Sequence, residues 1–150
     1  MSLEQKIMAE LKPAMLAKDE KTVRSLRAVK AAIIVAKTAE GASGELSEDE
    51  EIKLLQKLVK QRKDSLEIFT TQNRPDLASR EQEEIAVIER FLPAQMSGEE
   101  LKAKLKEIIQ RTGASSTADL GKVMGIASKE LAGKADGKSI STTVKELLST

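Results

Sequence analysis

The sequence predicts an all-α protein, and three observations support this. The apolar residues are mostly Leu, Ile, Ala, Val and Met, while Phe69 and Phe91 are the only aromatic residues. Charged residues make up 33% of the chain. The chain is rich in Ala, Leu, Glu and Lys, and these residue types favour helices. The apolar residues also recur at helical spacing. A length of 150 residues suits one ordinary domain or two very small ones.

The chain contains neither cysteine nor histidine. Disulfides, zinc fingers and thiol chemistry are therefore excluded, and both the usual general base and the commonest metal ligand are missing. We expect no cofactor and no metal site. The N-terminal residues show no signal peptide, and no stretch approaches the roughly 20 apolar residues of a membrane span. We therefore expect a cytoplasmic location and no membrane partner.

A first helix is predicted from an apolar stripe of helical period that contains Leu3, Ile7, Met8, Leu11, Met15 and Leu16. Pro13 lies inside the stripe and should kink this helix, because its ring meets the carbonyl group of Ala9. Asp19 is a suitable N-cap for a second helix, which should bury Val23, Leu26, Val29 and Ile33. The glycines of Gly41–Gly44 then predict a turn.

A third helix should begin at Ser47–Glu50, which matches the pattern of a capping box. The acidic residues there suit the positive end of the helix dipole, so we interpret them as capping residues and not as metal ligands. The seam of this helix consists of Ile52, Leu55, Val59, Arg62, Leu66 and Phe69, and Arg62 breaks its apolar run. A fourth helix should start near Pro75 and present Leu77, Glu81, Glu84, Ile85, Ile88 and Leu92.

Antiparallel pairing of the third and fourth helices would bring Arg62 near Glu81 and Glu84. Two interpretations are open. The favoured one is a structural ion pair at the edge of the core, and the other is a polar functional site between the helices. A buried ion pair is weak evidence for stability, so its presence calls for an explanation.

The segment Phe91–Ser97 is the predicted boundary, because Pro93 disfavours a helical conformation at the residue before it. Residues 1–92 should form a four-helix domain or a pair of hairpins, and residues 97–150 a small three-helix domain. Two further capping boxes are predicted, at Ser97–Glu100 and at Ser116–Asp119. The inward positions of the three helices are Leu101, Leu105, Ile108, Ile109, Leu120, Val123, Met124, Ala127, Leu131, Ile140, Val144, Leu147 and Leu148.

The stretch Leu120–Gly137 differs most from a generic amphipathic helix. Gly121 and Gly125 lie one turn apart, and each glycine should cost about 1 kcal/mol relative to alanine inside a helix. Glycines at this spacing create a smooth surface that another backbone can approach closely. A neighbouring helix and a phosphodiester backbone both fit this surface.

The lysines in and beside this stretch favour a phosphodiester backbone over a neighbouring helix as the partner of the glycine surface. Lys122 and Lys129 are seven residues apart and therefore lie on one side of a helix, while Lys134 and Lys138 lie in or beside the loop that follows. We expect Gly133 and Gly137 to let this loop expose backbone N–H groups. No aromatic residue is available here for base stacking, so recognition of the shape and backbone of folded RNA is expected, rather than of single strands.

The C-terminal region resembles the tail domain of the B subunit of the tRNA-dependent amidotransferase (GatB), through the residues G-K-V-M-G…K-E-L-A-G-K-A-D-G…V-K-E-L-L. Residues 60–97 are similar to the stand-alone YqeY-like proteins of the GatB/YqeY family, and this resemblance covers essentially the whole chain. It implies an N-terminal helical hairpin domain and a GatB-tail-like three-helix domain. In the amidotransferase, the tail helps to hold the tRNA.

Carried over residue by residue, the resemblance implies RNA-contacting positions at Lys122, Gly125, Gly133, Lys134 and Gly137. With Lys129 and Lys138, these residues form the predicted RNA-binding set. The family's polar set in the first domain matches Arg62, Ser65, Arg74, Asp76, Glu81 and Glu84. Its role is unknown, and the structural interpretation remains favoured.

The function expected from these features is that of a tRNA-binding accessory protein. Its expected partner is tRNA, with an aminoacyl-tRNA synthetase or amidotransferase components as further candidates. Two alternatives remain: a part in a glutamine-dependent carbon–nitrogen ligase activity, and a protein-interaction adaptor that takes a partner helix on its glycine surface. Amidotransfer needs an activated nucleophile and an ATP site. The chain has no cysteine and no P-loop, so we predict no catalytic residues and no autonomous enzyme.

Overall fold

The computed structural model describes residues 1–42 and 44–149. Within these residues it contains seven α-helices, one short 3₁₀ helix and no strand, which confirms the predicted all-α class. The chain divides into two compact units, Met1–Leu92 and Pro93–Thr150, and each has its own apolar core. None of the helices in the described part of the chain combines the length and apolar character needed to cross a membrane.

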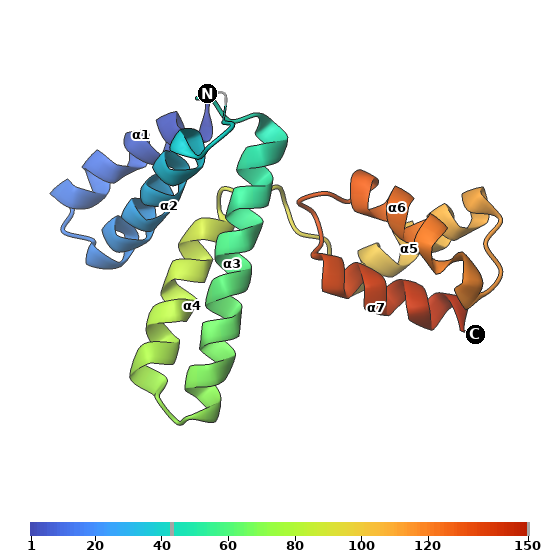
Figure 1. Cartoon of the computed structure of the whole chain (residues 1–150). Coiled ribbons are helices and arrows are strands. Elements are labelled where there is room, and N and C mark those ends of the chain that lie inside the picture. The colour runs from blue at the N-terminus through green and yellow to red at the C-terminus, as the bar shows by residue number, and fades with distance from the viewer. Residues whose placement is uncertain (43, 150) are drawn as a thin grey trace. The chain divides into compact units, whose positions relative to one another are not determined.

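The N-terminal unit consists of two helical hairpins (Figure 1). The first pairs α1 (Leu3–Leu16) with α2 (Glu20–Thr38), and the second pairs α3 (Glu48–Thr71) with α4 (Pro75–Glu89). Helix α2 also packs against both helices of the second hairpin, so it joins the two hairpins into one unit. Ser43, in the predicted Gly41–Gly44 turn, lies outside the described residues.

Side-chain caps explain where α1, α2 and α3 begin. Ser2 and Ser47 each form a complete capping box, with Gln5 and Glu50 respectively. Asp19 accepts a hydrogen bond from the backbone N–H of Thr22 at 3.2 Å. The carboxylate of Glu51 accepts a hydrogen bond from the backbone N–H of Leu3, so one of the acidic residues at the start of α3 caps α1 instead.

Both hairpins turn through a residue with a positive φ angle, Lys18 (57°) and Asn73 (56°). After α1, the N–H of Lys18 donates to the carbonyl of Met15 at 3.1 Å, and the N–H of Asp19 donates to the carbonyl of Ala14 at 3.0 Å. These two bonds form a Schellman motif, which satisfies carbonyl groups at the helix end.

The core of the N-terminal unit is made of aliphatic residues from all four helices, namely Leu3, Ile7, Leu11, Ala14, Leu26, Val29, Ile33, Leu55, Val59, Ile85, Val87 and Ile88. Three members of the predicted first stripe lie outside it, because Met8, Met15 and Leu16 are 46%, 50% and 77% exposed. Helix α1 buries only the narrow side that faces its neighbours. It continues through Pro13 to its end at Leu16.

The C-terminal unit packs α5 (Gly98–Thr112), α6 (Leu120–Glu130) and α7 (Gly137–Leu148) around a second core, with the 3₁₀ helix η1 (Thr117–Asp119) before α6. The core residues are Leu101, Leu105, Ile108, Val123, Ala127, Leu131, Ala135, Ile140, Val144 and Leu148. The predicted inward residues Ile109, Leu120, Met124 and Leu147 are only partly buried and pack against the edge of this core.

The predicted capping box at Ser116–Asp119 does not form. The Ser116 side chain accepts a hydrogen bond from the N–H of Ala118 at 3.3 Å, and the Asp119 carboxylate accepts one from the N–H of Ser115 at 3.0 Å. Asp119 therefore reaches back to the preceding loop, the segment becomes η1, and α6 starts at Leu120 without a side-chain cap. The Ser97 cap on α5 is present, with the N–H of Glu100 as its donor at 3.2 Å.

Candidate nucleic-acid interface

Helix α6 has one buried side and one bare side. Val123 and Ala127 are fully buried against the other helices. Gly121 and Gly125 lie on the exposed side, and a Cβ atom added at either position would meet nothing within 4 Å. Packing within the chain therefore does not account for these glycines. Each glycine weakens an exposed helix by about 1 kcal/mol relative to alanine, and no contact with the described residues offsets this cost.

The two lysines of α6 differ in their surroundings. The Nζ atom of Lys122 donates to the carbonyl oxygen of Thr112 at 3.2 Å, so this side chain caps the C-terminus of α5. Lys129 is exposed, and its side chain has no hydrogen-bond or ion-pair partner in the described part of the chain. Lys122 therefore has a structural role that its sequence position did not reveal, whereas Lys129 is available for a ligand.

An ion pair reduces the negative charge beside this face. The Nη2 atom of Arg111 donates to both carboxylate oxygens of Glu130 at 2.7 Å. These hydrogen bonds lower the pKa of the Glu130 carboxyl and raise the pKa of Arg111. Glu130 is the last residue of α6, so without Arg111 its charge would oppose that of Lys129 next to it.

The loop after α6 is more tightly held than the sequence predicts. Gly133 is buried at a φ of 79°, a conformation that favours glycine, and its carbonyl oxygen accepts a hydrogen bond from Nε2 of Gln95 at 2.6 Å. The N–H groups of Lys134 and Ala135 both donate to the carbonyl of Leu131, at 2.9 and 3.3 Å. The expectation of exposed N–H groups is therefore wrong for these two residues, because the loop uses them in its own turn.

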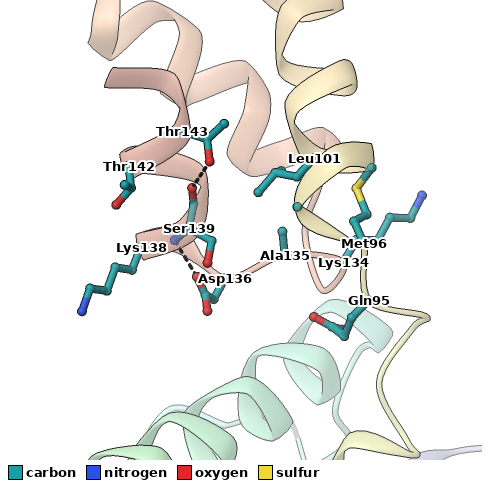
Figure 2. A pocket seen from close by; sticks show the side chains of 11 residues that line it. Gln95, Met96, Leu101, Lys134, Ala135, Asp136, Lys138, Ser139, Thr142 and Thr143 are labelled. Carbon is teal, nitrogen blue, oxygen red and sulfur yellow. Dashed lines mark hydrogen bonds between the residues drawn. The ribbon is translucent and has the colours of Figure 1, made fainter. Parts of the chain in front are cut away.

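A pocket of about 420 Å³ lies where this loop meets the start of α7 (Figure 2). Lys134 and Lys138 line it together with three hydroxyl groups and an apolar floor, which come from Ser139, Thr142, Thr143, Met96, Leu101 and Ala135. Asp136 is also a lining residue, and its carboxylate accepts a hydrogen bond from the N–H of Ser139 at 2.6 Å. Figure 2 shows the Lys138 side chain extending away from the pocket.

Gly137 is the first residue of α7, and a Cβ atom there would also meet nothing within 4 Å. The first N–H groups of a helix have no acceptor within the helix and carry the positive end of its dipole. The carboxylate of Asp136 already occupies part of this position, so the helix start alone is a weak anion site. Lys134 and Lys138, which line the pocket beside this helix start, add positive charge.

The polar set of the N-terminal unit separates into two groups. The Nε atom of Arg62 donates to Glu84 Oε2 at 3.1 Å, and its Nη1 atom donates to the carbonyl of Leu58 at 3.1 Å. The other oxygen of Glu84 accepts from Nε of Arg24 at 3.1 Å. Glu84 therefore connects α2, α3 and α4, and its side chain is only 12% exposed.

The other four residues of the predicted set do not join this ion pair. Arg74 and Asp76 pair with each other at 3.0 and 3.2 Å near the exposed start of α4. The side chains of Ser65 and Glu81 have no hydrogen-bond partner in the described residues, and burial, followed by the nearby carboxylate of Glu84, raises the pKa of Glu81. Within the predicted set, side-chain hydrogen bonds therefore join only Arg62 to Glu84 and Arg74 to Asp76.

Arg24 also belongs to the Glu84 network, although we did not predict it from the sequence. It bonds Glu84 through Nε and Glu83 through Nη2 at 3.0 Å, and Lys21 pairs with Glu83 at 3.2 Å. The sequence did contain an indication of this role. Arg24 lies between the inward residues Val23 and Leu26 of its helix, just as Arg62 lies between Val59 and Leu66.

No group of three or more metal-binding side chains occurs within residues 1–42 and 44–149.

Comparison with known proteins identifies the family. The model of the family described as Yqey-like protein matches residues 4–148. The chain belongs to the YqeY-like family. This match covers both units, and therefore includes the exposed glycine face and the Glu84 network.

This YqeY-like chain is similar to several fungal proteins named altered inheritance of mitochondria protein 41, mitochondrial. It is 36% identical to the protein of Clavispora lusitaniae over 73% of the chain and 64% of that protein, and 39% identical to that of Lachancea thermotolerans over 55% and 44%. With the protein of Saccharomyces cerevisiae it shares 33% identity over 93% of the chain and 73% of the relative. The chain thus spans less than two thirds of the length of the Clavispora lusitaniae and Lachancea thermotolerans proteins.

These names contradict the cytoplasmic location expected from the sequence, because the relatives are named as mitochondrial proteins. The expectation was wrong because it was based on features that are missing. Features that are not seen in the sequence do not distinguish one compartment from another.

Proposed function

We propose that the C-terminal unit of this YqeY-like protein binds folded RNA of the tRNA class through the exposed glycine face of α6 and the lysines around it. The observation that carries the proposal is the bare surface at Gly121 and Gly125, where none of the described residues would contact an added Cβ atom within 4 Å. Each exposed glycine costs the helix about 1 kcal/mol, and no contact among the described residues offsets this cost. Close approach of a ligand to the helix would offset it.

The chemistry of this face suits a phosphodiester backbone. The missing side chains let phosphate groups approach the helix closely, and Lys129, Lys134 and Lys138 supply charge without ion-pair partners in the described residues. Contacts of lysines and backbone groups to phosphates position a nucleic acid without reading its sequence. The pairing of Glu130 with Arg111 offsets the carboxylate charge next to Lys129.

The experiment measures binding of fluorescently end-labelled bulk tRNA to the full chain by anisotropy, at several salt concentrations. The parent should lose affinity as salt rises. A plot of the logarithm of the association constant against the logarithm of the salt concentration should fall with a slope of roughly −0.7 to −0.9 for each phosphate neutralised. The double variant Lys129→Glu, Lys138→Glu should bind about tenfold or more weakly. Neither side chain has a hydrogen-bond or ion-pair partner among the described residues, so this variant should keep the stability of the parent.

The matched control is Lys102→Glu, Lys106→Glu, which changes the charge equally at two exposed lysines of α5 in the same unit. It should bind tRNA nearly as tightly as the parent. An equal loss in both variants would show that only net charge matters. Absence of tRNA binding by the parent, together with a partner protein whose binding is lost in Gly125→Leu, would favour an adaptor instead.

A further inference from the structure

A second pocket, of about 480 Å³, lies in the N-terminal unit at the turn between α1 and α2. Three cationic side chains, one carboxylate and two apolar side chains line it, namely Lys18, Arg24, Arg27, Glu20, Met15 and Val23. It contains none of the residues of the proposed RNA surface. Neither the Glu84 network nor RNA binding by the C-terminal unit gives this pocket a role.

The charges of the pocket are only partly balanced within the molecule. Arg24 is held by Glu83 and Glu84 on α4, as described above. Lys18 and Arg27 have no ion-pair partner for their side chains in the described part of the chain. The pocket therefore presents two cations that form no ion pair with the described residues, beside one carboxylate, that of Glu20. Such a lining attracts negatively charged groups.

The same pocket exposes apolar surface. Met15 is 50% exposed, although it lies in an α-helix whose other side is well packed, and Val23 is only partly buried. Leu16, next to Met15 in the chain, is 77% exposed. Methionine adapts its shape to different apolar partners. An inorganic anion or a sugar–phosphate backbone would leave this apolar surface without a contact.

The backbone at Lys18 adds an independent observation. Its φ angle of 57° is in the left-handed region, where side chains other than those of glycine and asparagine are disfavoured. The other positive-φ positions in the described residues are Gly41, Gly44, Asn73, Gly113 and Gly133, so only Lys18 departs from the preferred residue types. The Schellman turn would be more favourable with glycine. The lysine is therefore present at a conformational cost that the turn does not require.

We propose that this pocket binds an acidic amphipathic segment of a partner protein. Carboxylates of the segment pair with Lys18 and Arg27, and an apolar side chain packs against Met15 and Val23. Complementary charge sets the orientation, and burial of the apolar side chain supplies the affinity, as in other grooves that take amphipathic peptides. The site is distinct from the RNA surface, so a single chain can hold RNA and a protein segment through different units.

The test starts from a displayed library of random dodecapeptides, selected on the full chain and counter-selected on the Arg27→Glu variant. The expected consensus combines Asp or Glu with Leu, Ile, Phe or Met. A labelled consensus peptide should bind Arg27→Glu at least about tenfold more weakly than the parent, and Lys18→Gly several-fold more weakly. Because glycine suits the Lys18 backbone, the second variant should be at least as stable as the parent, so its loss of binding cannot be due to misfolding.

The matched control is Lys6→Glu, an equal charge reversal on α1 at an exposed lysine outside the pocket, and it should bind like the parent. Amide resonances of Met15–Arg27 should shift when the peptide is added, and should not shift when tRNA is added. A selection that yields no acidic consensus, equal binding by parent and Arg27→Glu, or tRNA-induced shifts at these residues would overturn the proposal. Loss of tRNA binding in the Lys129→Glu, Lys138→Glu variant should leave peptide binding unchanged.

Discussion

Arg62 and Glu84 lie 22 residues apart on adjacent helices and are joined by a hydrogen-bonded ion pair of 3.1 Å. The same carboxylate holds Arg24, which lies 60 residues before it in the chain, at the same distance. One partly buried side chain thus links three helices, and the two hairpins of the N-terminal unit share it. Removing its charge would leave two guanidinium groups without their common partner.

Glu84→Gln should therefore lower the free energy of unfolding by about 1 to 3 kcal/mol, less than for a fully buried pair because the arginines keep some solvent contact. Urea denaturation monitored by circular dichroism measures this change. Asp76→Asn serves as a control, because it removes the exposed pair with Arg74 and should leave the unfolding midpoint almost unchanged. An equal loss in both variants would contradict the structural role of Glu84.

Glu81 should make the stability of the N-terminal unit depend on pH. Burial, followed by the charge of Glu84, raises the pKa of Glu81 in the folded protein. The folded state therefore binds this proton more tightly than the unfolded chain, so the contribution of Glu81 is most favourable below the ordinary pKa of glutamate and is lost as the pH rises through the raised pKa. Glu81→Gln should stabilise the protein at neutral pH, and this gain should disappear in acid. A gain that is constant with pH would contradict the assignment.

The exposed glycines of α6 should be suboptimal for folding. Gly121→Ala and Gly125→Ala should each raise the free energy of unfolding by about 0.5 to 1 kcal/mol, because the added methyl group meets no neighbour and alanine favours helix. Thermal unfolding of the single variants measures this gain. Gly133→Ala should instead destabilise the protein, because Gly133 has a positive φ angle. A loss of stability at Gly125 would show that the glycine is required for packing.

Arg111 should support tRNA binding through its pairing with Glu130. Arg111→Ala frees the carboxylate beside Lys129, so we expect weaker binding of the labelled tRNA. The double variant Arg111→Ala, Glu130→Ala has the same net charge as the parent and should recover most of the affinity. Anisotropy titrations of the parent, Arg111→Ala, Glu130→Ala and the double variant form a double-mutant cycle. Failure of the second substitution to recover binding would indicate a direct contact between Arg111 and the RNA.

The helical class could be predicted from the sequence because helix propensity and apolar spacing are local properties. Leu55 and Val59, spaced by four residues, are buried as the pattern indicates. The same spacing predicted too many buried residues in α1, because the number of helices that pack against a helix decides how many of its residues are buried. Met15 fits the stripe but has too little covering it, and half of its surface remains exposed.

The details of the candidate site depend on contacts between distant residues, which periodicity does not report. The lysine spacing identified Lys122 and Lys129 as neighbours on one side of a helix. It could not show that Lys122 reaches the end of α5 at Thr112, while Lys129 has no side-chain partner among the described residues. Nor could it show that Gln95 would hold the Gly133 loop, because a glutamine before a helix carries no local signal for such a bond.

The bonds of Gln95 and Met96 have a practical consequence for cutting the chain. Gln95 donates to the carbonyl of Gly133, and the N–H of Met96 donates to the carbonyl of Lys134 at 2.9 Å. A C-terminal fragment that begins at Ser97 would lose both bonds and leave two carbonyl groups of the loop without their partners. A fragment that begins at Pro93 keeps them. Limited proteolysis should accordingly release a resistant C-terminal piece whose first residue lies before Gln95.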